Sequence, residues 1–287
     1  MTNISKIFLN NALKNPNKKI IGEKLNNKWK WYTQNELNNK VIFCRERLLD
    51  CNINKSDRVI YKGKNSINWL AWNLATYSVG GVWIPVYHNQ NKDYIDHVYK
   101  NSDSKLFIND GDDLSKFKNI KNIINNNIDE SEYNNEYNIT NNELSNIIYT
   151  SGTSGKPKGV MLSHNNLLSN IESIKIRFKD FDHIENMKCL NILPWAHIYS
   201  LNTELYYNLL NENQIALSAG PENFINEIRE INPHTLYLVP RVLEEIKKKL
   251  DKFDIVLVRN LIPIIIKKFF NFCYTLVNVF ALYINSL

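Results

Sequence analysis

The sequence lacks the features that mark a secreted or disulfide-stabilised protein. Its four cysteines (Cys44, Cys51, Cys189 and Cys273) are scattered and show no paired spacing of the kind that binds metals. This usage is typical of reduced thiols in a reducing compartment. The first residues contain no basic region followed by an apolar core, so we expect no secretory signal. Together these absences favour a cytoplasmic protein.

A strong charge of one sign is also missing. The chain has 35 basic and 29 acidic residues, a formal net charge of +6. Its basic clusters are short, such as Lys247-Lys248-Lys249, which is most simply the solvated face of a helix. This balance suits a protein that binds a nucleotide or an anionic surface, and it does not favour nucleic acid as a partner.

No uncharged apolar run is as long as a membrane-spanning helix requires. The longest candidate, Phe269 to Ile284, has 16 residues, whereas a spanning helix needs about 20. Asn271 and Asn278 weaken it further. With Lys267-Lys268 before it, residues 253–287 could form a tail that makes a peripheral contact with the endoplasmic reticulum or another membrane. A buried core segment, or an abnormal terminus from a truncated or misread gene, is the favoured alternative.

Short apolar runs alternate with helical patterns along the rest of the chain. Its 287 residues, 44% of them hydrophobic, are enough for a sizeable core. The expected strands are 20–22, 29–32, 59–61, 82–86, 106–108, 144–149, 160–162, 189–193, 214–217 and 235–239. The expected helices are 33–49, 66–77, 94–99, 165–176, 221–231 and 241–250. This alternation predicts an α/β fold of layered, Rossmann-like sheets flanked by helices.

The same patterns suggest how the chain is divided. Residues 1–111 form a first α/β half, and residues 143–252 form a second half. Between them, residues 112–142 are polar and rich in asparagine, which is typical of a surface insertion or linker. Residues 253–287 form the atypical apolar tail.

One loop, YTSGTSGKPKG from Tyr149 to Gly159, concentrates chemistry that suits an anion. Apolar runs on both sides predict that it connects two strands. Glycines allow successive backbone N–H groups to face one side, and hydroxyls add further donors. A lysine, Lys156 or Lys158, supplies a point charge. The candidate phosphate-binding residues are Thr150, Ser151, Gly152, Thr153, Ser154, Gly155 and Lys158.

This loop is not the P-loop of nucleoside triphosphatases. That motif has four residues between its glycines, then lysine followed by serine or threonine, and a helix. Here two residues separate Gly152 from Gly155, Pro157 follows Lys156, and a strand comes next. A solvated turn without function is the remaining alternative.

The stretch from Tyr149 to His164 closely resembles the signature of the AMP-forming adenylate synthetases. This family includes acyl-CoA synthetases, luciferases and the adenylation domains of peptide synthetases. In it, the loop wraps the β- and γ-phosphates of ATP while a carboxylate attacks the α-phosphate. The resemblance therefore implies that Thr150 to Gly155 and Lys158 bind ATP, with Mg²⁺ as cofactor. The order of elements ahead of Tyr149 is similar to the family as well.

A second segment narrows the resemblance. Leu193-Pro194-Trp195-Ala196-His197 is similar to a Leu-Pro-x-x-His segment of long-chain acyl-CoA synthetases, where the histidine lies at the junction of the acyl pocket and the thiol channel. His197 is accordingly expected to border an acyl pocket. The alternative is a core histidine satisfied by a backbone carbonyl. The Tyr237 to Glu244 segment also resembles that branch, and Arg241 is assigned no catalytic role.

The resemblance covers roughly Ile20 to Leu250 and then stops. The family's adenine-binding Tyr-Gly-x-Thr/Ser-Glu motif, its ribose-binding aspartate and its catalytic lysine are not found, and no glycine follows Gly220. The chain thus resembles an incomplete N-terminal domain of an acyl-adenylate-forming enzyme. Its catalytic residues are not assigned, and none of its residues is assigned as a metal ligand.

The function implied is ATP-dependent activation of a fatty acid. The acid and ATP give an acyl-adenylate and pyrophosphate, and coenzyme A then displaces AMP. We expect this chain alone to be truncated and inactive, because without the missing elements it cannot align the attack. A non-catalytic nucleotide-binding or membrane-associated fragment is the alternative.

Overall fold

The computed structural model of the protein describes residues 3–110, 139–150, 156–179, 185–242 and 244. The chain divides into two units, Met1–Tyr237 and Leu238–Leu287, and the account below concerns the first. In the second, a helix begins at Pro240 as predicted. Most of residues 112–142 and all of the tail 253–287 lie outside the described residues.

A four-stranded sheet, with strand order β2-β1-β9-β8, combines an antiparallel hairpin with two parallel strands. Asn26 and Asn27 form the hairpin turn at φ values of 49° and 59°. Tight two-residue turns favour asparagine because it tolerates positive φ. The strands are β1 (Lys19–Leu25), β2 (Lys28–Thr33), β8 (Lys188–Asn191) and β9 (Gln214–Leu217).

A five-stranded sheet has the order β5-β3-β4-β6-β7. Its first four strands are parallel, and the edge strand β7 pairs antiparallel to β6. Each of the two sheets thus takes strands from both sides of residues 112–142, so the two sequence halves are interleaved in space. The strands are β3 (Arg58–Gly63), β4 (Val82–Tyr87), β5 (Leu106–Asn109), β6 (Leu144–Thr150) and β7 (Lys158–Ser163).

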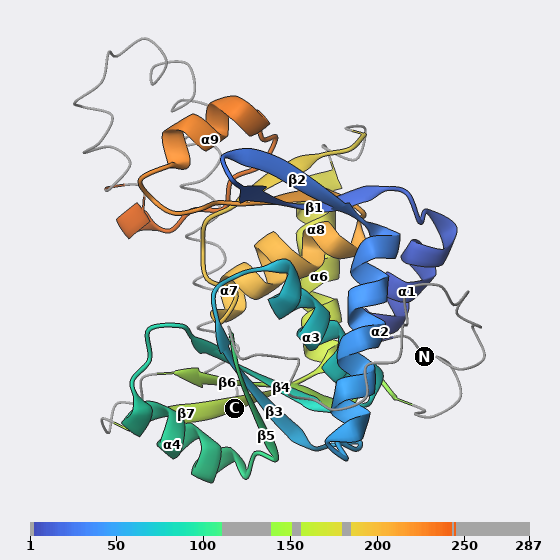
Figure 1. Ribbon diagram of the computed structural model, residues 1–287, viewed down its shortest axis with the longest axis vertical. Helices are drawn as coiled ribbons and strands as arrows, with labels where there is room; N and C mark the ends of the chain where they lie inside the picture. The colour runs from blue at the N-terminus through green and yellow to red at the C-terminus, as the bar shows by residue number, and fades with distance from the viewer. Residues whose placement is uncertain (1–2, 111–138, 151–155, 180–184, 243, 245–287) are drawn as a thin grey trace. The chain divides into compact units, whose positions relative to one another are not determined.

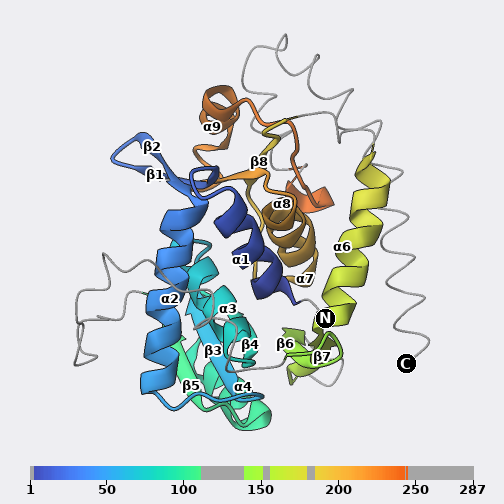
Figure 2. The same ribbon diagram turned by 90° about the vertical axis from the view of Figure 1, so that its right-hand side faces the viewer.

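Helices separate and cover the two sheets. Figures 1 and 2 show α1, α2, α3, α6 and α8 between the sheets, with α9 on the outer side of the four-stranded sheet and α4 on the outer side of the five-stranded one. The predicted layered α/β fold is confirmed. The helices are α1 (Ile4–Lys14), α2 (Gln34–Asp50), α3 (Ile67–Ser78), α4 (Lys92–Ser102), α6 (His164–Phe178), α7 (Ile198–Ser200), the π-helical η3 (Leu201–Tyr206), α8 (Tyr207–Leu210) and α9 (Phe224–Ile231).

Helix starts follow the capping signals of the sequence. Thr33 and Glu36 form a reciprocal capping box at the start of α2. Ser66 caps α3 through the N–H of Trp69, and Ser163 caps α6 in a capping box with Asn166. These hydrogen bonds satisfy backbone donors that have no partner inside the helix. The predicted starts of these helices are therefore confirmed within one or two residues.

Other predicted elements were wrong. Residues 235–239 are not a strand. Among them only Thr235 forms a β-bridge, which is isolated and pairs it with Cys189. Tyr237 instead packs its ring on Phe178 of α6, with ring centroids 6.1 Å apart. Strand β8 ends at Asn191 rather than Leu193. The helix expected from Pro221 begins at Phe224, and two helical segments, α1 and residues 198–210, were not predicted.

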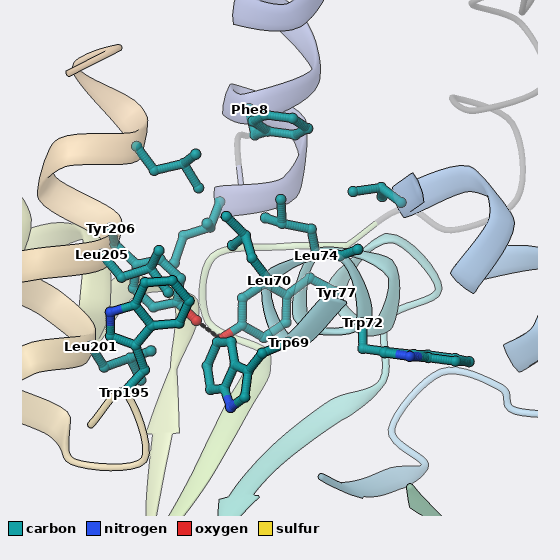
Figure 3. Close-up of a cluster of buried hydrophobic side chains, with 14 of the residues drawn as sticks. Phe8, Trp69, Leu70, Trp72, Leu74, Tyr77, Trp195, Leu201, Leu205 and Tyr206 are labelled. Atoms are coloured by element: carbon teal, nitrogen blue, oxygen red, sulfur yellow. Dashed lines mark hydrogen bonds between the residues drawn. The ribbon is translucent and has the colours of Figure 1, made fainter. Parts of the chain in front are cut away.

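The core of the first unit is built around aromatic side chains, some of which Figure 3 shows. Trp69 on α3 is fully buried. The centroid of its ring lies 5.1 Å from the ring centroid of Trp83 and 5.3 Å from that of Trp195. Nearby, the Tyr77 hydroxyl lies 2.6 Å from that of Tyr206. In the described part of the chain, no helix combines the length and apolar character needed to cross a bilayer.

Candidate functional site

The hairpin β6–β7 holds both ends of the glycine- and hydroxyl-rich loop. Thr150 pairs with Lys158, and Tyr149 pairs with Gly159, so the chain leaves β6 and re-enters β7 at matched positions. The prediction that the loop connects two strands is confirmed. Ser151, Gly152, Thr153, Ser154 and Gly155 lie outside the described residues, so their role in binding phosphate stays a prediction.

Helix α4, on the outer side of the five-stranded sheet, forms hydrogen bonds with this hairpin. The His97 imidazole Nε2–H donates to the Pro157 carbonyl over 2.9 Å. One turn later, Asn101 accepts a hydrogen bond of 2.7 Å from the Tyr149 hydroxyl. The His97 and Tyr149 rings also meet edge to face, with centroids 6.4 Å apart. Sequence reasoning missed these two supports, whose only sequence signal is their i, i+4 spacing on one helix.

Gly159 is required by close packing on the strand pair. A Cβ atom at this position would lie 2.6 Å from Cγ2 of Ile147 and 3.1 Å from Cζ of Tyr149. Contacts that short force the neighbouring side chains to move. The glycine therefore lets β7 lie close to β6 where the loop returns.

The described ends of the loop present polar groups to solvent at one edge of the sheet. Thr150, Lys156 and Lys158 are all exposed. Strand β6 runs parallel to β4, so Thr150 ends the strand at the carboxyl edge, where ligands of open α/β sheets bind. A hydroxyl and two ammonium groups at this edge suit a polyphosphate.

A metal ion is bound most firmly where several ligand side chains lie close together. Among the described residues, no group of three or more His, Cys, Asp or Glu side chains could hold one. Hard cations such as Mg²⁺ prefer several oxygen ligands. The described residues form no such cluster, and Mg²⁺, which usually binds through one or two carboxylates together with water and substrate phosphates, does not require one.

The second predicted segment follows strand β8. His197 is exposed and caps α7, with its Nδ1 accepting a hydrogen bond of 3.2 Å from the Tyr199 N–H. The alternative of a buried core histidine is therefore wrong. An exposed imidazole beside a helix start can contact a ligand, and its predicted place at an acyl pocket stays a prediction.

Buried neighbours hold this segment in place. Trp195 is fully buried, and its backbone N–H donates to Oδ1 of Asn65 over 2.9 Å. The Ser200 hydroxyl donates to the Pro194 carbonyl. Glu204, also fully buried, accepts from backbone N–H groups ahead of Pro194. Sequence reasoning singled out the segment with Pro194 and Trp195 but missed its supports Asn65, Ser200 and Glu204. Leu201, Leu205 and Leu209 recur every four residues and indicate the helix that carries Glu204.

Comparison with known proteins places this arrangement in a family. The profile of the AMP-binding enzyme family matches residues 8–261. Long chain acyl-CoA synthetase 3 of Arabidopsis thaliana is 25% identical over 281 residues, covering 84% of this chain and 42% of the relative. Fatty acyl-CoA synthetase B of Dictyostelium discoideum is 34% identical over 109 residues, covering 38% of this chain and 16% of the relative.

Solved structures share the fold. A fatty acid AMP ligase from Legionella pneumophila superposes with a TM-score of 0.67 at 23% identity, over 82% of this chain and 43% of that chain. The N-terminal domain of FACL13 from Mycobacterium tuberculosis gives a TM-score of 0.70 at 19% identity, over 85% of this chain and 64% of that one. The chain spans less than half the length of the curated relatives it matches. Because the family profile matches most of its residues, the protein belongs to the AMP-binding enzymes.

Proposed function

We propose that the protein containing this chain activates a fatty acid with ATP. The carboxylate of the acid attacks the α-phosphorus of ATP, the bond to pyrophosphate breaks, and an acyl-adenylate forms. The thiol of coenzyme A then displaces AMP to give the acyl-CoA. Fixed donors are needed where charge develops on the phosphates.

One observation carries this proposal: β6 and β7 hold both ends of the hydroxyl-rich loop at the carboxyl edge of a parallel sheet. Thr150 and Lys158 lie at the two ends of that loop, where they can contact the β- and γ-phosphates together with Ser151 to Gly155. His197 would border the acyl group. Two relatives are named for long-chain or fatty acyl substrates, which supports a long-chain acid.

The proposal also includes a cofactor, a second substrate and a cellular setting. Mg²⁺ and coenzyme A are proposed because the resemblance to acyl-CoA synthetases implies them. The cytoplasmic setting inferred from the scattered cysteines belongs to the same proposal, as does a peripheral membrane contact through residues 253–287, which lie outside the described residues.

The test is ATP–pyrophosphate exchange, measured with the longest natural form of the protein that contains this chain. We expect palmitate to drive exchange and amino acids to leave it at background. Exchange driven by amino acids and not by fatty acids would refute the assignment. Nucleotide binding without exchange would favour a non-catalytic nucleotide-binding role.

The phosphate loop can be tested by removing one cation. In Lys158→Ala, the KM for ATP in palmitate-driven exchange should rise roughly tenfold, because a charge-assisted hydrogen bond contributes about 1.5–3 kcal/mol. Lys28→Ala removes an equally exposed lysine from the start of β2 and is the control. Equal KM values for ATP in the two variants would show that Lys158 does not contact the nucleotide.

A further inference from the structure

A buried carboxylate organises the exit of strand β8. Glu204 is 0% exposed, and its oxygens accept hydrogen bonds from the Ile192 N–H at 3.2 Å, from the Leu193 N–H at 3.2 Å and from the Asn191 side-chain amide. Every one of these partners is a donor. The carboxylate therefore acts as a multiple acceptor, and it ends the strand by taking donors that would otherwise continue the ladder.

The residues that Glu204 holds lead directly into the segment that bears His197. Asn65, which precedes α3, also forms hydrogen bonds with this segment. Its amide donates to the Leu193 carbonyl over 2.8 Å and to Oδ1 of Asn191 over 2.7 Å, and its own Oδ1 accepts from the Trp195 N–H. The stretch from Asn191 to Trp195 is thus tied both to η3 and to the residue just before the N-cap of α3.

The element that carries Glu204 also reaches strand β6. Tyr206 lies two residues later on η3, and its hydroxyl meets that of Tyr77, as Figure 3 shows. Tyr77 in turn donates to Oδ1 of Asn146 on β6 over 2.6 Å. Isolated π-helical turns of this kind often occur at functional sites. One short segment therefore contacts the strand exit before His197 directly and is linked through Tyr77 to the strand before the phosphate loop.

Glu204 itself cannot be a catalytic group in this arrangement. It is fully enclosed, and its contacts are to backbone and amide donors of the same exit. A carboxylate so placed can act on a substrate only through the segment that it holds. A purely structural role, in which it contributes to stability alone, is the competing explanation.

We propose that Glu204 is a positioning residue that sets the Pro194–His197 segment and thereby the affinity for the acyl substrate. This inference rests on the proposed function, since it takes His197 to border the acyl group. Truncation of Glu204, or its replacement by glutamine, leaves the backbone N–H groups of Ile192 and Leu193 with fewer acceptor oxygens. The segment then loses its defined position, and acyl binding weakens.

The chain offers a matched control in Glu227, a second fully buried carboxylate. It holds the exit of the neighbouring strand β9, accepting from the Ser218 hydroxyl at 2.5 Å and from the Ala219 N–H at 3.0 Å. Glu204→Gln and Glu227→Gln therefore each replace one buried acceptor oxygen with an amide NH₂ group at one strand exit. Only Glu204→Gln changes a side chain that is bonded to the residues leading into the segment with His197.

The experiment compares both variants in ATP–pyrophosphate exchange. We expect Glu204→Gln to raise the KM for palmitate roughly tenfold, because an unsatisfied buried donor weakens the fold locally, with the KM for ATP unchanged. Glu227→Gln should leave the KM for palmitate within about twofold of the wild type. Equal palmitate KM values in the two variants would overturn the proposal.

A second readout separates this proposal from the proposed function. Amide hydrogen exchange of residues 191–197 should accelerate in Glu204→Gln and stay at the wild-type rate in Glu227→Gln. If the wild type shows no exchange with any fatty acid, the proposed function fails, while the amide measurement still tests what Glu204 holds. Unchanged protection of residues 191–197 in Glu204→Gln would refute positioning by this side chain.

Discussion

Replacing Trp69 with alanine should lower the free energy of unfolding by roughly 3–5 kcal/mol, the range seen when a large buried aromatic is removed. Trp69 is fully buried, and its ring centroid lies 5.1 Å from that of Trp83, 5.3 Å from that of Trp195 and 6.3 Å from that of Tyr61. The variant therefore leaves a cavity lined by other aromatic rings, which cannot collapse easily. Urea denaturation followed by circular dichroism measures the effect.

Trp29→Ala is the control for this prediction. Trp29 lies on the hairpin of β1 and β2, is half-buried, stacks on Trp31 at 6.4 Å and donates one hydrogen bond of 2.7 Å to Glu230. Its loss should cost only about 1 kcal/mol. If the two substitutions shift the urea midpoint equally, Trp69 is not the centre of the core.

The free energy of unfolding should fall by about 3 kcal/mol as the pH drops from 6.5 to 4, because of His164 alone. Desolvation by burial lowers the pKa of His164 from 6.5 to about 4, and the Glu143 carboxylate acts in the opposite direction. The ring is 1% exposed and meets Tyr77 edge to face at 4.9 Å. Between these two pH values the unfolded chain binds a proton that the folded protein does not, so acid favours unfolding.

A non-titrating variant isolates this contribution. In His164→Asn, the slope of unfolding free energy against pH should be shallower than in the wild type between pH 4 and 6.5, whatever the variant does to stability at neutral pH. Urea midpoints measured at half-unit pH intervals give both slopes. Parallel slopes would mean that His164 is protonated in the folded protein, contrary to its burial.

The sequence was most informative where local chemistry decides structure. Thr33 and Glu36 cap α2 through side chains three residues apart, so a short window was sufficient to predict where that helix begins. The turn at Asn26 and Asn27 was predictable for the same reason. The loop between β6 and β7 was recognisable because glycines, hydroxyls and lysines cluster within it.

Sequence patterns failed where a distant side chain decides the outcome. Residues 235–239 have the composition of a strand, but Tyr237 packs on Phe178 of α6, and the pairing stops at Thr235. Strand β8 ends early because Glu204, 12 residues beyond Ile192, accepts its backbone donors. Such competition cannot be read from β-propensity, which depends on context.

The sequence by itself determined the class of fold, most helix starts and the loop that suits a polyphosphate, because each depends on residues close together in the chain. Only the tertiary structure brought β6 beside β4, interleaved the two halves of the chain in each sheet, and placed His97, Asn65 and Glu204 against the segments they support. These contacts join residues that are up to 130 positions apart. Their formation depends on packing of the whole core, which no local pattern encodes.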